Sequence, residues 1–272
     1  MHLIDIGANL THSSFHDDLG AVVARARAAG VGTIIATGST ALESRLAAEI
    51  ADRFGLYCTA GVHPHHARDC NEHTIAELRK LALHPRCVAT GECGLDFNRN
   101  YSPHPAQEKA FVAQLELGLE LGKPLFLHSR DAHPRFAQIL RTHGVKTAVA
   151  HCFTGEADEL RAYLDLDLYV GITGWICDER RGTHLLRLVR DIPADRLLLE
   201  TDSPYLTPRD MKPQPKARRN EPAFLPHILR TVARALGQAP EEVAVQTTRN
   251  AQRLFGIDES RALSTASRAA AG

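Results

Sequence analysis

The sequence lacks the features that mark membrane and secreted proteins. No run of about 18 consecutive apolar residues occurs in the 272-residue chain, so we expect no transmembrane helix. The first segment, MHLIDIGANL, has neither a basic start nor a long apolar run, which argues against a signal peptide. The six cysteines include no Cys-x-x-Cys pair, so a zinc finger is not indicated and reduced thiols are expected. A cytoplasmic protein is therefore predicted.

An excess of charge of either sign is also absent. Lys and Arg total 32 and Asp and Glu total 32, so the chain has no general electrostatic attraction for nucleic acid. A nucleic-acid surface would have to be local. One short segment is rich in basic residues: Arg209, Lys212, Lys216, Arg218 and Arg219. A solvated loop explains the same cluster, and composition alone favours that interpretation.

What the sequence contains is a regular alternation of short apolar runs and amphipathic stretches. Eight runs rich in Val, Ile and Leu are candidates for strands buried on both faces: 3–6, 33–36, 56–62, 87–90, 124–127, 147–150, 168–172 and 196–199. Amphipathic stretches predict helices over 17–29, 42–54, 74–83, 105–121, 135–142, 156–164 and 181–189. This alternation predicts a single (β/α)8 barrel, with an open doubly wound sheet as the alternative.

The remaining segments define the expected domain limits. No G-x-G-x-x-G turn follows the first run, so dinucleotide binding is not indicated. The proline-rich, charged segment 211–222 is expected to form a functional loop over one mouth of the barrel, followed by helices over 223–236 and 240–254. We expect one barrel domain over 1–258 and a disordered tail over 259–272.

Residues suited to metal binding stand where several apolar runs end. Glu92, His128 and His151 close the fourth, fifth and sixth runs, and Asp202 follows the eighth. Since the carboxyl ends of barrel strands meet at one mouth, these four residues should converge. Two imidazoles and two carboxylates are ligands for a divalent cation. A single histidine of this kind is more often a hydrogen-bonded strand-end residue, but two histidines and two carboxylates at four separate run ends favour a metal site.

Other polar residues near the predicted mouth have two interpretations each. His63 either contacts substrate phosphate or serves loop structure, and Arg130 either holds a phosphate oxygen or pairs with Asp96 or Asp131. The loop after the eighth run contains three candidate phosphate contacts: Arg218, Arg219 and Asn220. The alternative interpretation is a structural ion pair with Glu221. Trp175 either stacks on a base or packs in the core, and core packing is the default.

Seven motifs then give the sequence a family resemblance. They are GVHPHH from Gly61, GECGLDFNRN from Gly91, HSRDAH from His128, HCFTG from His151, CDERRG from Cys177, ETDSPYL from Glu200 and RRNEP from Arg218. In this order and spacing they resemble the TatD family of metal-dependent DNases over about residues 1–257.

The resemblance implies a barrel of the amidohydrolase type that hydrolyses DNA with a divalent cation, usually magnesium or manganese, with zinc as an alternative. It implies that Glu92, His128, His151 and Asp202 form the metal site, with Asp202 as a ligand or as the general base. The most similar branch is associated with 3′→5′ exonuclease action on single-stranded DNA, with RNA as a further substrate and a role in DNA repair or turnover.

One departure from the family pattern concerns the first strand. Most members have a His-x-His pair there, whereas this chain has Gly7 and Asn9 at the matching positions. Gly7 has no side chain to ligate a metal, and Asn9 is at best a weak oxygen ligand. A single metal site, or a second metal that binds only with substrate, is the expectation.

Two other functions fit parts of the same sequence. A small-molecule or ester hydrolase, such as an aminoacyl-tRNA deacylase, would use the same metal residues without a basic mouth for phosphate. A binding protein without catalysis would fit the missing histidine pair but not the retained Glu92, His128, His151 and Asp202. No apolar stripe suggests an oligomer interface, so a monomer is expected.

Overall fold

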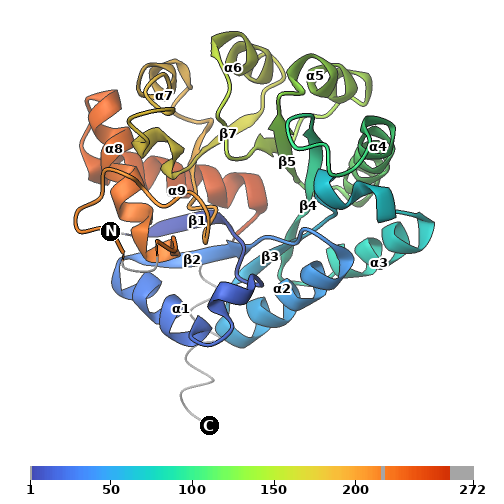
Figure 1. Ribbon diagram of the computed structural model, residues 1–272, viewed down its shortest axis with the longest axis horizontal. Coiled ribbons are helices and arrows are strands. Elements are labelled where there is room, and N and C mark those ends of the chain that lie inside the picture. The colour runs from blue at the N-terminus through green and yellow to red at the C-terminus, as the bar shows by residue number, and fades with distance from the viewer. Residues whose placement is uncertain (1, 216–217, 258–272) are drawn as a thin grey trace.

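The computed structural model describes residues 2–215 and 218–257 as a ring of helices around one parallel sheet (Figure 1). The sheet has eight strands in the order β1 to β8, and each strand is parallel to the next. The strands are β1 Leu3–Ala8, β2 Val31–Ala36, β3 Tyr57–Ala60, β4 Cys87–Asp96, β5 Leu125–Arg130, β6 Ala148–Ala150, β7 Tyr169–Ile172 and β8 Leu197–Leu199. Every predicted apolar run therefore contributes a strand.

The ring closes between the first and last strands. Ala8 forms a parallel bridge with Ser203, just beyond β8. Backbone hydrogen bonds reinforce the bridge: the N–H of Asp202 donates to the carbonyl of Gly7 (2.8 Å), and the N–H of Asn9 donates to the carbonyl of Ser203 (2.7 Å). Closure satisfies the backbone groups that an open sheet would leave at its two edges. The predicted (β/α)8 barrel is confirmed, and the open sheet is wrong.

Nine α-helices are found in the described part of the chain: α1 Leu19–Ala28, α2 Ala41–Phe54, α3 Glu72–Ala82, α4 His104–Leu121, α5 His133–Thr142, α6 Ala157–Leu164, α7 Leu185–Leu188, α8 Leu225–Leu236 and α9 Pro240–Phe255. Local signals set their ends. The side chain of Thr40 accepts from the N–H of Glu43 before α2, and Gly55 ends α2 with φ +67°.

The predicted helix over 181–189 is wrong in its first half. The carbonyl of Asp178 accepts from the N–H groups of both Arg181 and Gly182, which makes a turn. A Cβ on Gly182 would lie 1.8 Å from the carbonyl oxygen of Trp175, so this turn is held tightly against the preceding 3-10 helix η3, Gly174–Cys177. The α-helical part of the segment is therefore short.

The predicted strand ends are also wrong at two site residues. Glu92 and His128 lie within β4 and β5 and do not end them. The pairing of β4 with β5 passes from Gly91↔Phe126 to Cys93↔Leu127, so Glu92 is the extra residue of a bulge. Bulges beside active sites re-aim a side chain without ending the strand. The strand continues past Glu92 to Asp96 for this reason.

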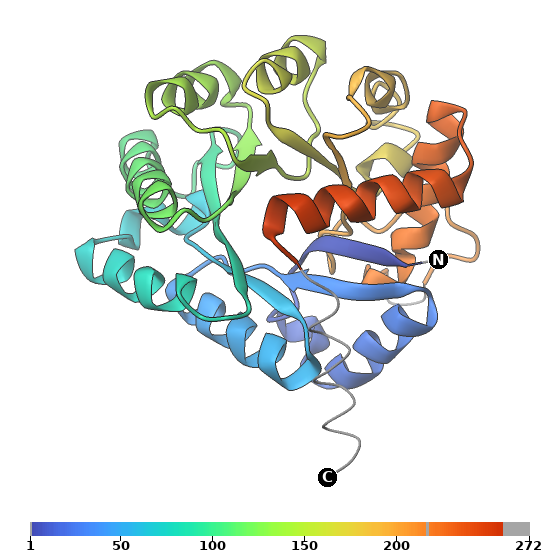
Figure 2. The same ribbon diagram turned by 180° about the vertical axis from the view of Figure 1, so that it is seen from behind.

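Two apolar cores hold the barrel together. The larger core lies between the sheet and the outer helices. The smaller one fills the barrel interior with side chains such as Ile6, Phe126 and Leu198, and Leu254 and Phe255 of α9 join it. Figure 2 shows α9, in red, lying across the end of the barrel at which the strands begin. The opposite mouth, at the carboxyl ends of the strands, is the end left for a functional site.

Several other expectations concern the whole chain. No helix in the described residues is long and apolar enough to cross a membrane. All six cysteines are free thiols. The predicted disordered tail, 259–272, lies outside the described residues, as does Lys216 of the basic segment.

A buried acid stabilises the barrel seam in its neutral form. Asp5 of β1 is fully buried and accepts from the N–H (2.9 Å) and the hydroxyl (2.6 Å) of Thr201. Burial raises the pKa of Asp5 from 3.8 to about 8, and the hydrogen bonds from Thr201 oppose this shift. Between these two values the folded protein keeps a proton that the unfolded chain loses. Stability is therefore greatest below the unfolded pKa and falls as pH rises towards 8.

We predict that Asp5→Asn flattens this pH dependence, because the amide resembles the neutral acid and cannot ionise. As pH rises between the two pKa values, the free energy of unfolding of the unsubstituted protein should fall relative to that of the variant by about 1 kcal/mol per pH unit. Urea unfolding across this pH range measures the difference, with exposed Asp165→Asn as the control. Parallel curves for Asp5→Asn and the unsubstituted protein would contradict the prediction.

Candidate active site

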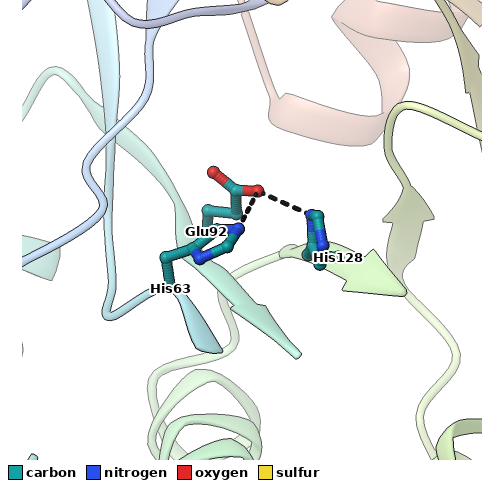
Figure 3. A group of neighbouring side chains, drawn as sticks. All are labelled: His63, Glu92 and His128. Carbon is teal, nitrogen blue, oxygen red and sulfur yellow. Dashed lines mark ion pairs between the residues drawn. The ribbon is translucent and has the colours of Figure 1, made fainter. Parts of the chain in front are cut away.

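The mouth of the barrel is organised around the carboxylate of Glu92. Its Oε1 lies 2.7 Å from Nε2 of His151, 3.0 Å from Nδ1 of His128 and 3.4 Å from Nε2 of His63. Figure 3 shows Glu92 reaching from its strand towards His63 and His128. His128 is on β5, His151 directly follows β6, and His63 lies between β3 and the 3-10 helix η2, Pro64–Asp69. Three imidazoles from three barrel units thus meet one carboxylate oxygen.

This arrangement fits a divalent cation. The ligand-type atoms of His63, Glu92 and His128 all lie within 4.8 Å of one another. His151 contacts the same oxygen of Glu92 from the side of β6. Two ligand atoms that each lie about 2.0–2.2 Å from a common ion are at most about 4.4 Å from one another, so a small movement of these side chains would place an ion between them. Nitrogen and carboxylate donors suit zinc, manganese and related divalent ions.

The electrostatics of the group favour a charged Glu92. Burial alone raises the pKa of its carboxyl, but the surrounding histidines outweigh burial and hold that pKa well below its usual value. Burial lowers the pKa of His63 well below 6.5, which leaves a neutral imidazole able to ligate. The pKa of His151 is raised well above 6.5 despite burial, because the charges of Glu92 and Glu200 favour its protonated form. Binding of a cation would release such protons.

A buried carboxylate stands behind His128. Asp96 Oδ2 lies 3.7 Å from Nε2 of His128 and 2.7 Å from Nε2 of His65. Its Oδ1 accepts from the backbone N–H groups of Asn98 and Arg99. Asp96 is thereby fixed on the side of His128 that faces away from Glu92. Carboxylates in this position set the ring orientation and tautomer of a metal-binding histidine.

A second buried carboxylate stands behind His151. Glu200 Oε2 lies 3.4 Å from Nδ1 of His151, and its Oε1 accepts from the N–H of Cys152 (2.5 Å). Two glycines make room for it, since a Cβ on Gly7 or Gly171 would come within 2.5 Å of a Glu200 oxygen. Gly7 stands at the position where the pattern that the sequence resembles has the first histidine of its His-x-His pair. Here Glu200 and the ring of Phe126 close that space to any side chain.

Asp202 lies at the edge of this group. Its Oδ1 accepts from Nδ2 of Asn9 (2.9 Å), and no hydrogen bond or ion pair joins its side chain to Glu92, His128 or His151 within residues 2–215 and 218–257. Burial raises the pKa of Asp202 to about 7, with a further rise from the charges of Glu92 and Glu200 and an opposing effect of His151. Its backbone is left-handed (φ 52°), a conformation that Asp and Asn adopt more readily than other non-glycine residues. Of the four predicted metal-site residues, Glu92, His128 and His151 therefore lie in contact, and Asp202 lies beside them.

Arg130 points from β5 across the mouth. Its guanidinium carbon lies 5.3 Å from the ring centre of Trp175. Within the described residues it forms no ion pair with Asp96 or Asp131, the partners in its alternative interpretation. The arginine is free to bind an anion there.

The three predicted phosphate contacts after β8 have different surroundings. Arg218 has no ion pair among the described residues, and it lines a cavity at the mouth. Arg219 pairs with Asp18 (2.8 Å) and Glu221 (2.7 Å). Asn220 is fully buried, and its amide donates to backbone carbonyls on either side of the turn after β8. The contacts of Arg219 and Asn220 favour a role in holding the loop, and their contact with substrate stays a prediction.

Sequence reasoning missed the supporting carboxylates. Asp96 appeared only as a rival partner for Arg130, and Glu200 and His65 only inside motifs. One signal was available: side chains two or four positions apart in an extended strand share a face. Asp96 stands four residues after Glu92 in β4, so this rule reaches it, whereas Glu200 follows the end of β8.

Comparisons with known proteins give the chain its relatives. The family model described as TatD related DNase matches residues 4–256. A protein of Erwinia amylovora named 3′-5′ ssDNA/RNA exonuclease TatD is 55% identical over 259 residues, which cover 94% of this chain and 100% of that protein. A protein of the same name from Klebsiella pneumoniae is 52% identical and covers 94% of this chain and 98% of its own length.

Solved structures show the same similarity in three dimensions. The crystal structure of YJJV, a TatD homologue from Escherichia coli K12, has a TM-score of 0.86 at 26% identity and covers 94% of this chain and 98% of its own. A TatD family hydrolase from Entamoeba histolytica has a TM-score of 0.84 at 26% identity with the same coverage of both chains.

We predict that Glu200→Gln lowers the affinity for a divalent cation about 10- to 100-fold. With the amide oxygen kept towards the N–H of Cys152, the NH2 group would face Nδ1 of His151, so the imidazole could no longer carry its proton there and bind metal through Nε2. Calorimetric titration with manganese measures the loss. Glu116→Gln, an exposed position on α4, is the matched control. Equal affinities for Glu200→Gln and the unsubstituted protein would show that Glu200 only fills space.

Proposed function

Because this chain belongs to the TatD-related DNase family, we propose that it is a metal-dependent 3′→5′ exonuclease acting on single-stranded DNA or RNA. One observation carries the proposal: three histidines converge on the buried Glu92 carboxylate at the open mouth of the barrel. The proposed direction of digestion and the preference for single strands follow the names of relatives that match nearly the whole chain.

The proposed metal ligands are Glu92, His128 and His151, with His63 as a further nitrogen donor and Asp202 at the edge. Magnesium or manganese is the proposed ion, with zinc as the alternative that the nitrogen donors allow. When bound, the cation supplies an acidified water and polarises a phosphoryl oxygen. Glu92 supplies the anionic ligand. Glu200, 3.4 Å from Nδ1 of His151, holds that ring with Nε2 towards Glu92, and Asp96 lies 3.7 Å from Nε2 of His128 on the far side of that ring.

Asp202 is the proposed proton acceptor. Its raised pKa, about 7, is well matched to accept a proton near neutral pH, and Asn9 fixes one oxygen so that the other is free. Arg130 and Arg218, which have no carboxylate partner among the residues described, are the proposed contacts to the phosphates of the strand. Both lie at the same mouth as the histidines. A place in DNA repair or turnover fits this activity.

We predict that the metal-stripped protein releases mononucleotides from the 3′ end of single-stranded DNA only after magnesium or manganese is added. Strands labelled at the 5′ end should shorten stepwise, and 3′-labelled strands should lose their label at once. The double variant His128→Ala, His151→Ala should remove the activity, because it deletes two of the nitrogen donors. Gel analysis of both labels measures direction and metal dependence in one experiment.

The outcome also separates the proposal from its rivals. Stepwise loss from the 5′ end would overturn the direction but keep the nuclease. Confirmed metal binding without cleavage of DNA or RNA would favour an ester or small-molecule hydrolase. An active double variant would show that the site is elsewhere.

We infer that the protein works as a monomer in the cytoplasm. The exposed large apolar side chains in the described residues are scattered over separate elements, for example Leu42 on α2 and Val245 on α9. Free thiols suit a reducing compartment. Sedimentation velocity should give a single species near 29.8 kDa, and a species of twice that mass would contradict the inference.

A further inference from the structure

A cavity whose lining has a different chemistry lies beside Glu92 and its three histidines. It is a cavity of about 560 Å³ between η3 and the loop after β8. Its lining includes two aromatic residues and four arginines: Trp175, Tyr205, Arg180, Arg181, Arg209 and Arg218. The volume is that of an ordinary small-molecule site. None of the three histidines or Glu92 lines it.

One buried carboxylate positions most of the arginines. Asp178 lies 3.2 Å from Arg180, 3.1 Å from Arg181 and 3.6 Å from Arg209, and only 4% of its side chain is exposed. The side chains of these arginines are about half exposed. Four arginines against Asp178 and against Glu179, which pairs with Arg209 at 3.4 Å, leave the cavity with a net positive charge. A shared carboxylate of this kind fixes guanidinium groups in place while their other donors stay available.

The aromatic rings give the cavity flat surfaces. The guanidinium carbon of Arg181 lies 4.2 Å from the ring centre of Trp175. Tyr205 belongs to the loop after β8, and 52% of it is exposed. A half-exposed ring and a guanidinium plane backed by an indole are the surfaces on which unpaired bases stack.

Two contacts join the cavity to the site around Glu92. Arg130, two residues after His128, lies over Trp175 at 5.3 Å. The N–H of Tyr205 donates to the carbonyl of Asp202 (3.1 Å). A strand with one phosphodiester at Glu92 therefore has a neighbouring positive hollow within reach along the same mouth.

We propose that this cavity binds a second nucleotide of the single strand, adjacent to the one being cleaved. Its base stacks on Tyr205 and on the Arg181 guanidinium that covers Trp175. Its phosphate is held by the arginines anchored on Asp178. The inference rests on the proposed nuclease function and gives that function a subsite that reads the strand beyond the scissile bond.

The only tryptophan in the chain reports binding directly. In protein treated with a chelator, so that no turnover occurs, a ten-nucleotide single strand should quench the fluorescence of Trp175. An abasic strand of the same length should quench much less, because it has the phosphates without the bases. Equal quenching by the two strands would overturn base stacking, and no quenching by either would overturn the site.

Kinetics provide the second test. Tyr205→Ala should raise the KM for the ten-nucleotide strand about tenfold more than the KM for bis(p-nitrophenyl) phosphate, because it loses one base stack. Tyr205→Phe keeps the ring and should restore the KM for the strand. Arg141→Ala, exposed at the end of α5, is the control for a lost surface arginine when Arg181→Ala is tested.

The outcomes distinguish this inference from the proposed function. Quenching without hydrolysis of any nucleic acid would keep the subsite and overturn the nuclease. Hydrolysis with equal changes in KM for the strand and the small diester would keep the nuclease and overturn the subsite.

Discussion

The buried carboxylate of Glu92 is the constraint on which the rest of the site depends. A charge removed from water is costly unless polar partners surround it. Here the partners are imidazoles from three separate βα units, and two of those imidazoles are backed in turn by Asp96 and Glu200. The group is thus built outwards from one oxygen. The bulge in β4 makes this possible, because it turns Glu92 inward without interrupting a strand that must continue to Asp96.

The seam between the first and last strands couples stability to chemistry. Asp5 and Thr201 lock β1 to the segment after β8, and the same segment carries Glu200 and Asp202. Asn9, at the end of β1, reaches across the seam to Asp202. Closure of the barrel therefore fixes the edge of the active site. Gly7 belongs to this design as well, since the absence of its side chain leaves room for Glu200.

The sequence predicts the fold well because buried parallel strands have an unmistakable pattern. The runs near β2 and β8, for instance, begin or end within two residues of the strands found. Residues placed by single interactions are harder to foresee. The bulge at Glu92 and the pairing of Arg219 with Asp18 depend on partners remote in sequence, which no periodicity encodes. Asp96 was within reach of the alternation rule, but Glu200 and His65 were not.

The helix α9 has a consequence for how a long polymer meets this enzyme. Its side chains complete the interior core, and the helix covers the opening opposite the active site. Together, the packed interior and this helix leave no channel through the barrel among the residues described. A strand that enters must leave by the side it came from, so the polymer cannot be reeled through the protein while its end is removed. After each cut, the shortened strand and the freed nucleotide leave through the same mouth. For the next cut, the strand must move forward within that mouth.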